Sequence, residues 1–409
     1  MVSRSVRKLL LLFLLMLAAA PGADAATLLV FPPENLTKSA ALNWVGEGIA
    51  FSISEQCQSP DVETISWEER SRFIEASDLP PNTTLSRASM IRLAQRASVD
   101  FLIFGNYTGT EGNLRISLRA LHLKTMKLSG EMEATGPVTA LPQLENELAW
   151  VILSNNGLTG ALTREAFKAR TRVVPNRPYS MFIESLAVTD ESARFNLLQK
   201  ALAAYRDFPQ ASFLLGAYYY QSGDCVKTVQ YLKPALRDAQ DYLEAQFMLG
   251  TCSLRQDKPE GAIEAYSAIL TRLRSLEVFN NIGVAYLRKG DNPMAMQYLA
   301  NARNMNKADV TVAINLAVLQ RLQGDDKAAL AVLDDLVKTH PDLGMPQYLY
   351  SLALASQGQS EKAAAARERA AKLGIDAEKM SSQDPRTWTR LFSTWTRRPA
   401  STLAGEAKY

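Results

Sequence analysis

Histidine and cysteine are scarce in this sequence: its 409 residues include two histidines and three cysteines. Most zinc sites and histidine-activated nucleophiles need more of these side chains than the chain supplies. The phosphate-binding glycine loop, Gly-x-Gly-x-x-Gly, Gly-x-Ser-x-Gly and His-Glu-x-x-His are missing as well. These absences predict a protein that is not an enzyme and that needs no metal or other cofactor.

An excess of charge of one sign is also missing. The full sequence has 45 Lys and Arg against 42 Asp and Glu. Without residues 1–25, which hold three basic residues and one acidic residue, the balance is 42 against 41, or about +1. So small a net charge argues against general nucleic-acid binding.

Long hydrophobic runs are limited to the amino terminus. Arg4, Arg7 and Lys8 precede an apolar run over residues 9–20, and a small-x-small site ends at Ala25. This order is typical of a cleaved signal peptide, and about twelve apolar residues are too few to span a membrane. We expect residues 1–25 to be removed and the mature chain to be exported, periplasmic if the source is a bacterium with an outer membrane. We expect no transmembrane segment after cleavage.

A repeat of 33–34 residues organises the second half of the chain. Small residues recur at fixed steps of 34, 33, 34 and 34, and a turn residue follows each seven places later. The small residues are Gly216, Gly250, Gly283, Ala317 and Ser351, and the turn residues are Gly223, Asp257, Gly290, Gly324 and Gly358. This spacing predicts helix, short turn and helix in each unit, with small residues where two helices cross closely.

In period and pattern this stretch resembles the tetratricopeptide repeat. The resemblance predicts an array over 178–376, with a degenerate first unit at 178–208 and five clear units after it. Such arrays are binding scaffolds with varied ligands. Their first helices line a concave face, so we expect a groove that binds a protein or peptide. The predicted groove residues are Phe213, Tyr220, Phe247, Leu254, Arg255, Asn280, Asn281, Leu287, Arg288, Asn315, Arg321 and Tyr348.

Three of these residues, Arg255, Arg288 and Arg321, recur one repeat apart. Two interpretations remain open for them. They can complement the carboxyl ends of their helices, or they can form a basic rail suited to an acidic or extended peptide.

Residues 26–157 predict a separate α/β domain with a mixed sheet, in the order β-α-β-α-α-β-β-β-α. The whole chain is therefore expected to be α+β, with this domain followed by an all-α array. The stretches 28–35, 46–53 and 100–109 resemble exported α/β domains, including the amino-terminal domain of the Tol–Pal propeller protein and the periplasmic domain of the curli secretion channel. The resemblance implies a non-catalytic domain that docks onto envelope-associated partners.

The remaining segments connect or end the domains. Residues 158–177 are expected to be a linker or connecting helix. In 377–399, Trp388, Leu391, Phe392 and Trp395 fall at i, i+3, i+4 and i+7, which predicts a capping helix over the end of the last repeat. Residues 400–409 are expected to be disordered.

Two of the three cysteines lie in neighbouring repeats. Cys225 begins the second helix of one unit, and Cys252 lies within the first helix of the next, so their sulfurs could meet. A Cys225–Cys252 disulfide and two packing cysteines in place of alanine remain equal alternatives. For function, the main hypothesis is an exported, non-enzymatic scaffold. The alternative is an accessory or regulatory subunit of an envelope enzyme or secretion complex, whose α/β domain binds a small ligand.

Overall fold

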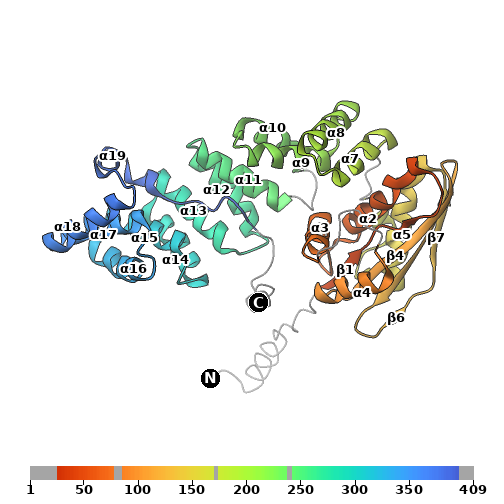
Figure 1. Ribbon diagram of the computed structural model, residues 1–409, viewed down its shortest axis with the longest axis horizontal. Helices are drawn as coiled ribbons and strands as arrows, with labels where there is room; N and C mark the ends of the chain where they lie inside the picture. The colour runs from red at the N-terminus through yellow and green to blue at the C-terminus, as the bar shows by residue number, and fades with distance from the viewer. Residues whose placement is uncertain (1–24, 78–84, 170–173, 237–241, 396–409) are drawn as a thin grey trace, which may run out of the picture. The chain divides into compact units, whose positions relative to one another are not determined.

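The structure, a computed structural model, describes residues 25–77, 85–169, 174–236 and 242–395. The predicted signal sequence before Ala25 and the tail 400–409 lie outside the described residues. The chain divides into two compact units, Met1–Arg206 and Asp207–Tyr409 (Figure 1). Each unit contains its own clusters of buried apolar side chains.

A mixed sheet forms the centre of the first unit. Its main path is β3-β1-β4-β5-β6, with β2 beside β4 and β7 beside β5. The strands β1, β3 and β4 pair in parallel, and β4 forms a long antiparallel ladder with β5. The strands are β1 (Ala26–Val30), β2 (Glu34–Asn35), β3 (Val62–Thr64), β4 (Phe101–Thr110), β5 (Asn113–His122), β6 (Lys127–Leu128) and β7 (Met132–Gly136).

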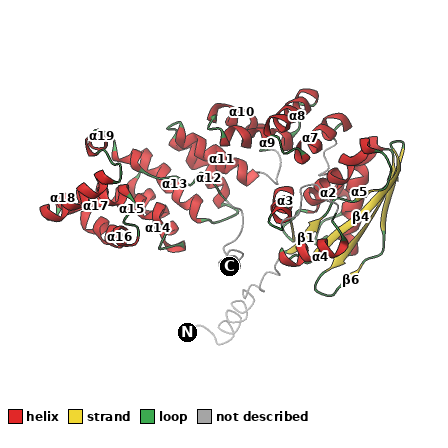
Figure 2. Ribbon diagram, viewed as in Figure 1, coloured by secondary structure: helices red, strands yellow, loops and turns green. Residues whose placement is uncertain are grey.

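Helices flank this sheet (Figure 2). On one face, Leu93 and Ala94 of α4 pack with Leu29 and Leu102. The helices α2 and α5 pack against each other, and the thiol of Cys57 is buried between them, 3.9 Å from the carbonyl oxygen of Ala149. Burial raises the pKa of this thiol, so Cys57 stays protonated. The helices are α2 (Asn43–Cys57), α3 (Trp67–Glu75), α4 (Arg87–Arg96) and α5 (Leu141–Asn155), with short 3₁₀ turns η1 (Ala40–Leu42) and η2 (Val138–Ala140).

Three further helices complete the first unit: α6 (Arg164–Ala169), α7 (Asn176–Ala187) and α8 (Glu191–Ala204). The pair α7–α8 covers most of the degenerate repeat predicted at 178–208. It groups with the sheet rather than with the array, because α7 packs on α2. The hydroxyl of Tyr179 donates to the carbonyl of Gly48 at 3.0 Å, and the ring of Phe182 meets Phe51 edge-on at 5.1 Å. The division after Arg206 therefore differs from the predicted start of the array at residue 178.

The described residues of the second unit form five successive helix pairs, followed by α19 (Ala377–Ser381) and η3 (Pro385–Trp388). In each pair the first helix packs on the second, and the second packs on the first helix of the next pair. The pairs are α9 (Pro209–Gln221) with α10 (Cys225–Ala235), α11 (Tyr242–Arg255) with α12 (Pro259–Leu270), α13 (Leu276–Lys289) with α14 (Asn292–Met305), α15 (Val310–Leu322) with α16 (Asp326–Thr339), and α17 (Gly344–Ser356) with α18 (Ser360–Lys372).

The repeated residues explain this pairing. A Cβ atom added to Gly283 would lie 2.7 Å from Leu299 on the partner helix, so only a very small residue fits at this crossing. Gly290 ends α13 with a φ of 88°, where L residues are strained, and the side chain of Asp291 then caps α14 by accepting from the N–H of Met294. The predicted fold class, α+β with a mixed-sheet unit followed by an all-α array, is therefore confirmed.

The carboxyl-terminal residues differ from the prediction. Within 377–395, the described part of this stretch, only α19 (Ala377–Ser381) and the 3₁₀ turn η3 (Pro385–Trp388) are helical, and residues 389–395 have no regular secondary structure. The predicted continuous helix is therefore wrong for 389–395. The apolar stripe does pack against the array, but it packs on α11, α13, α15 and α17 rather than on the end of the last repeat.

The described residues lack two features. None of the helices there is long and apolar enough to cross a membrane. No group of three or more His, Cys, Asp or Glu side chains in the same part of the chain is placed to hold a metal ion.

Candidate functional site

The first helices of the five pairs form a surface that is occupied by the chain itself. We call residues 388–395 the C-terminal segment, and the surface of α9, α11, α13, α15 and α17 that it contacts the groove. The segment begins at Trp388 beside α17 and ends at Trp395 beside α11. It therefore runs antiparallel to the order of the repeats, and in Figure 1 it is the blue coil that returns from α19 along the array.

Two asparagine side chains bind the backbone of this segment. Asn315 accepts from the N–H of Arg390 at 2.7 Å and donates to the carbonyl of Arg390 at 2.8 Å. Asn281 accepts from the N–H of Phe392 at 2.9 Å and donates to its carbonyl at 2.8 Å. One carboxamide thus pairs with both polar groups of one residue, as a strand does in an antiparallel sheet. Asn281 and Asn315 are one repeat apart, and they bind residues 392 and 390. The groove therefore binds alternate residues of an extended chain.

Buried partners fix both carboxamides. Asn280 accepts from the Nδ2 of Asn315 at 2.7 Å and donates to Asn281 at 3.1 Å, and it also reaches the carbonyl of Arg390 at 3.2 Å. Asn281 donates to the hydroxyl of Tyr266 at 3.1 Å, which lies 2.8 Å from the hydroxyl of Thr251. All three asparagines are fully buried. Buried amides need partners, and here the segment's backbone supplies several of them.

A large aromatic side chain anchors each end of the segment. Trp388 is 7% exposed and meets the ring of Tyr348 edge-on, with centroids 5.6 Å apart. Trp395 stacks on Phe247 with centroids 5.7 Å apart, and its Nε1 donates to Ser275 at 3.0 Å. Such aromatic pairs contribute about 0.5–1.5 kcal/mol beyond the area they bury.

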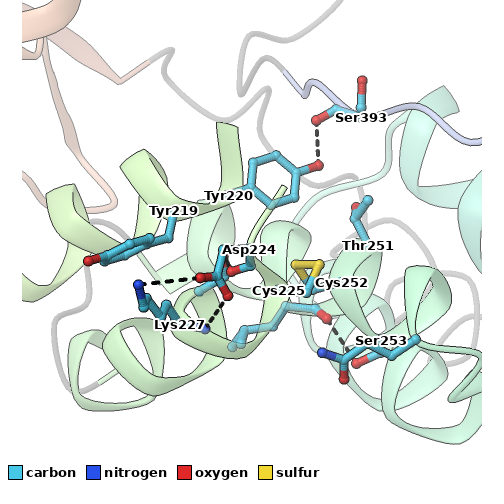
Figure 3. The surroundings of a disulfide bond; sticks show 12 residues. Tyr219, Tyr220, Asp224, Cys225, Lys227, Thr251, Cys252, Ser253 and Ser393 are labelled. Carbon is cyan, nitrogen blue, oxygen red and sulfur yellow. Dashed lines mark hydrogen bonds and ion pairs between the residues drawn. A yellow bond between two sulfur atoms is a disulfide. The ribbon is translucent and has the colours of Figure 1, made fainter. Parts of the chain in front are cut away.

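Side chains of α9 and α13 add two hydrogen bonds. Tyr220 donates through its hydroxyl to the carbonyl of Ser393 at 2.6 Å (Figure 3). Burial raises the pKa of Tyr220, which keeps this hydroxyl a donor at neutral pH. Arg288 donates to Thr389 Oγ1 of the segment at 3.3 Å. It also donates to the carbonyl of Leu254 in α11 at 2.9 Å.

The other predicted groove residues have different surroundings. The guanidinium of Arg255 lies 4.8 Å over the ring of Tyr220, and Arg321 pairs with Asp326 at 2.7 Å. Burial lowers the pKa of Arg288 and of Arg321, although an arginine remains charged. Phe213, Leu254 and Leu287 are buried among apolar side chains of the array and support the surface from below.

A disulfide joins Cys225 of α10 to Cys252 of α11, with their Cα atoms 5.2 Å apart (Figure 3). This separation lies within the usual range for a disulfide. Both cysteines pack against Tyr220, so the bond lies directly behind one contact of the C-terminal segment.

The occupant of the groove and three of the residues that hold it are not among the predicted site residues. Thr251, Tyr266 and Ser275 position Asn281 or bind Trp395, and none belongs to the predicted set. Tyr266 stands where three other repeats carry Leu232, Leu299 and Leu333. A tyrosine at this position was the available signal, since a buried phenol needs a polar partner.

A family model described as a tetratricopeptide repeat matches residues 229–275 and 280–344. These residues of the array are tetratricopeptide repeats. The predicted repeat is therefore confirmed over these residues, whereas the predicted resemblance of the α/β unit to exported docking domains is not. No curated protein matches the sequence.

Several solved structures are similar to part of this chain. A crystal structure of MamA shares 18% identity, covers 41% of this chain and 98% of its own, and has a TM-score of 0.37. YrrB, described as a TPR protein with an unusual peptide-binding site, shares 15% identity, with coverage of 46% and 98% and a TM-score of 0.38. TTC0263, a thermophilic TPR protein of Thermus thermophilus, shares 19% identity, with coverage of 43% and 96% and a TM-score of 0.35.

Proposed function

We propose that this protein is a non-enzymatic scaffold whose groove holds an extended segment of a protein partner. The observation that carries the proposal is the pairing of Asn315 with residue 390 and of Asn281 with residue 392, through both backbone groups each time. These contacts recognise an extended backbone, and any residue except proline offers them. Side-chain sites at the two ends then supply specificity.

The contacts are numerous enough for useful affinity. The two asparagine pairs alone make four hydrogen bonds to the segment, and a net 0.5–1.5 kcal/mol each amounts to roughly 2–6 kcal/mol. Trp388, which is buried, adds apolar burial of about 1.5–3 kcal/mol, and the partly buried Trp395 adds less. Fixing the backbone of an eight-residue segment opposes this gain, so a reversible complex is expected.

The test uses the full chain and a labelled peptide with the sequence of residues 385–395. In the background of Trp388→Ala with Trp395→Ala, which weakens docking of the chain's own segment, the peptide is expected to bind. Adding Asn281→Ala and Asn315→Ala is expected to weaken binding at least tenfold, since each change removes a donor and an acceptor. Asn304→Ala, an exposed position on α14, is the matched control. Fluorescence anisotropy measures the affinity.

Equal affinity in the asparagine and control variants, with unchanged helix content by circular dichroism, would contradict the proposal. Absence of peptide binding by every variant would do the same.

We also propose that the chain is exported and that its partner belongs to the cell envelope. The order of charged, apolar and small residues before Ala25 supports export. A disulfide between Cys225 and Cys252 suits an oxidising compartment. The likeness of stretches 28–35, 46–53 and 100–109 to exported docking domains supports an envelope partner. Sequencing the amino terminus of the mature protein is expected to give Ala26 first; an intact amino terminus in a cytoplasmic fraction would refute export.

The alternative, in which the α/β unit binds a small ligand, has weaker support. Ligands of such folds bind at the carboxyl ends of parallel strands. At the end of β1 this place is filled by Arg70, which donates to the carbonyl of Val30 at 3.0 Å and pairs with Glu47. Arg70 is 4% exposed. The scaffold function through the groove therefore remains the main proposal.

A further inference from the structure

The two ends of the C-terminal segment occupy distinct aromatic sites. One site, on α15 and α17, includes Val318, Tyr348 and Leu349, which form one buried cluster with Trp388. The other, formed by Phe247 of α11 and Ser275 at the start of α13, receives Trp395. Because both sites are built on packed helices, their separation is set by the array and not by the segment.

Between these ends the groove binds mainly backbone. The side chains of Arg390, Ser393 and Thr394 are exposed, although the backbone of Arg390 and Ser393 is bound. Leu391 and Phe392 are half-buried against apolar residues of the array. An occupant is therefore selected by its two ends, and its central residues need only be extended and free of proline at the bound N–H groups.

The distance between the two sites decides which conformation of the segment can reach both of them. Seven steps of extended chain cover about 23 Å, whereas seven steps of helix cover about 10 Å. An occupant that was helical between its two aromatic residues would leave one site empty. The same argument explains why the stripe from Trp388 to Trp395 does not form the predicted helix.

From this geometry we propose that the groove takes a partner's extended segment with two large aromatic side chains seven positions apart, and that residues 388–395 occupy the same sites in its absence. The inference rests on the proposed function and specifies the partner. Three residues, 382–384, separate the last residue of α19 from η3, so the tether is short. A short tether gives an effective concentration on the order of millimolar. The partner must therefore compete with the chain's own segment.

The experiment compares peptides and chains by fluorescence anisotropy. The peptide of residues 385–395 is the reference probe. Two altered peptides change the spacing: one inserts a glycine between the residues equivalent to Ser393 and Thr394, and one lacks the equivalent of Thr394. Each moves the second tryptophan by about 3.3 Å and turns it to the opposite face. A third peptide replaces both tryptophans with alanine.

The chains are the full wild-type protein and two variants that release the segment. One is Trp388→Ala with Trp395→Ala. The other is Arg390→Pro, which removes the N–H that donates to Asn315 at 2.7 Å and leaves every groove side chain in place. We expect the reference peptide to bind both variants at least tenfold more tightly than the wild type. We expect each altered peptide to bind the variants at least tenfold more weakly than the reference peptide does.

The outcomes separate the two proposals. Equal affinity for the peptides of all three spacings would overturn the proposal that the two aromatic residues lie seven positions apart. The proposal that the groove binds extended peptides would stand. Equal affinity of wild type and variants for the reference peptide would overturn the competition. A wild type that forms dimers which Arg390→Pro dissolves would show that the segment is exchanged between two copies, and it would overturn occupation within one chain. Failure of folded variants to bind any peptide would overturn the proposed function itself.

Discussion

At the scale of single residues, the carboxamide of Asn281 binds the N–H and the carbonyl of Phe392, as the edge of a strand would. The groups of Asn281 are held by Tyr266, whose ring fills the space beside Gly250. The burial that fixes this ring also raises the pKa of its hydroxyl, so the phenol stays neutral and can both donate and accept. The position of Asn281 thus depends on Gly250. A larger residue there would displace Tyr266, which holds the carboxamide of Asn281.

Replacing that glycine tests this dependence. In Gly250→Ala, the new Cβ would lie 2.8 Å from the ring of Tyr266, so the ring or the helix must move. We expect the free energy of unfolding of the second unit to fall by about 1–3 kcal/mol, as overpacked cores do. Urea unfolding measures the change.

The matched control is Gly261→Ala on α12. There the added Cβ meets only the side chain of Ser253, with its Oγ at 3.2 Å. Because alanine favours helix over glycine by roughly 1 kcal/mol, this variant is expected to be unchanged or more stable. If both variants lost the same free energy, the close crossing would not be the cause.

At the scale of elements, the disulfide ties the second helix of one repeat to the first helix of the next. It closes a loop with a sequence separation of 27 residues. The chain-entropy estimate for a loop of this size is roughly 3–4 kcal/mol. Since both sulfurs pack against Tyr220, the bond also fixes one donor to the C-terminal segment.

Cys225→Ala with Cys252→Ala is therefore expected to lower the free energy of unfolding of the second unit by roughly 3–4 kcal/mol. Reductant is expected to lower the unfolding midpoint of the wild type and to leave that of the double variant unchanged. Urea unfolding with and without reductant provides the measurement. A wild type that is insensitive to reductant would mean that the bond contributes nothing to stability.

Elements whose pattern reflects their own neighbours were predictable from the sequence. Apolar residues alternate along the sequence from Leu114, which predicts the strand β5, and the ladder with β7 runs from Leu114–Gly136 to Leu118–Met132. Residues 127–136 are divided into β6 and β7: the N–H of Ser129 still donates to the carbonyl of Ala120, but the N–H of Ala120 donates to the hydroxyl of Ser129. The helix pairs followed from small residues at fixed steps, since close crossings and turns are local requirements.

The C-terminal segment could not be predicted in the same way. Apolar residues at i, i+3, i+4 and i+7 suit one face of a helix. The same residues can also contact two distant sites when the chain between them is extended. The choice depends on Asn281 and Asn315, which lie more than 70 residues earlier and replace the hydrogen bonds that a helix would make. The groove asparagines were predictable from the repeat, whereas their occupant required the tertiary structure.

At the scale of the whole molecule, the two units differ in what their stability depends on. The second contains the disulfide. The first contains a buried carboxyl group: Glu145 is 1% exposed, and both its oxygens lie 3.4 Å from the hydroxyl of Tyr179. That hydroxyl donates its one hydrogen to the carbonyl of Gly48, so its oxygen can accept a hydrogen bond from the protonated carboxyl group of Glu145. Burial raises the pKa of Glu145 well above its ordinary range, and the contacts with Ser52 and Tyr179 offset this only in part.

The sign of the resulting pH dependence follows from linkage. A glutamate in the unfolded chain titrates near pH 4.3, and the folded pKa of Glu145 lies above that value. Between the two values the native state binds more protons than the unfolded state, so stability falls as pH rises. The slope cannot exceed about 1.4 kcal/mol per pH unit for one group. Below the unfolded pKa and above the folded pKa, Glu145 contributes no slope.

Calorimetry of the full chain tests the effect of pH through Glu145 and the effect of the disulfide in one experiment. Because each unit has its own core, we expect two unfolding transitions. Raising the pH from about 4.3 should lower the transition of the first unit more in the wild type than in Glu145→Gln, since the amide cannot ionise. Reductant should lower only the other transition, and Glu145→Gln should leave that response intact. One transition that shifted with both treatments would mean that the two units unfold together, which the separate cores do not predict.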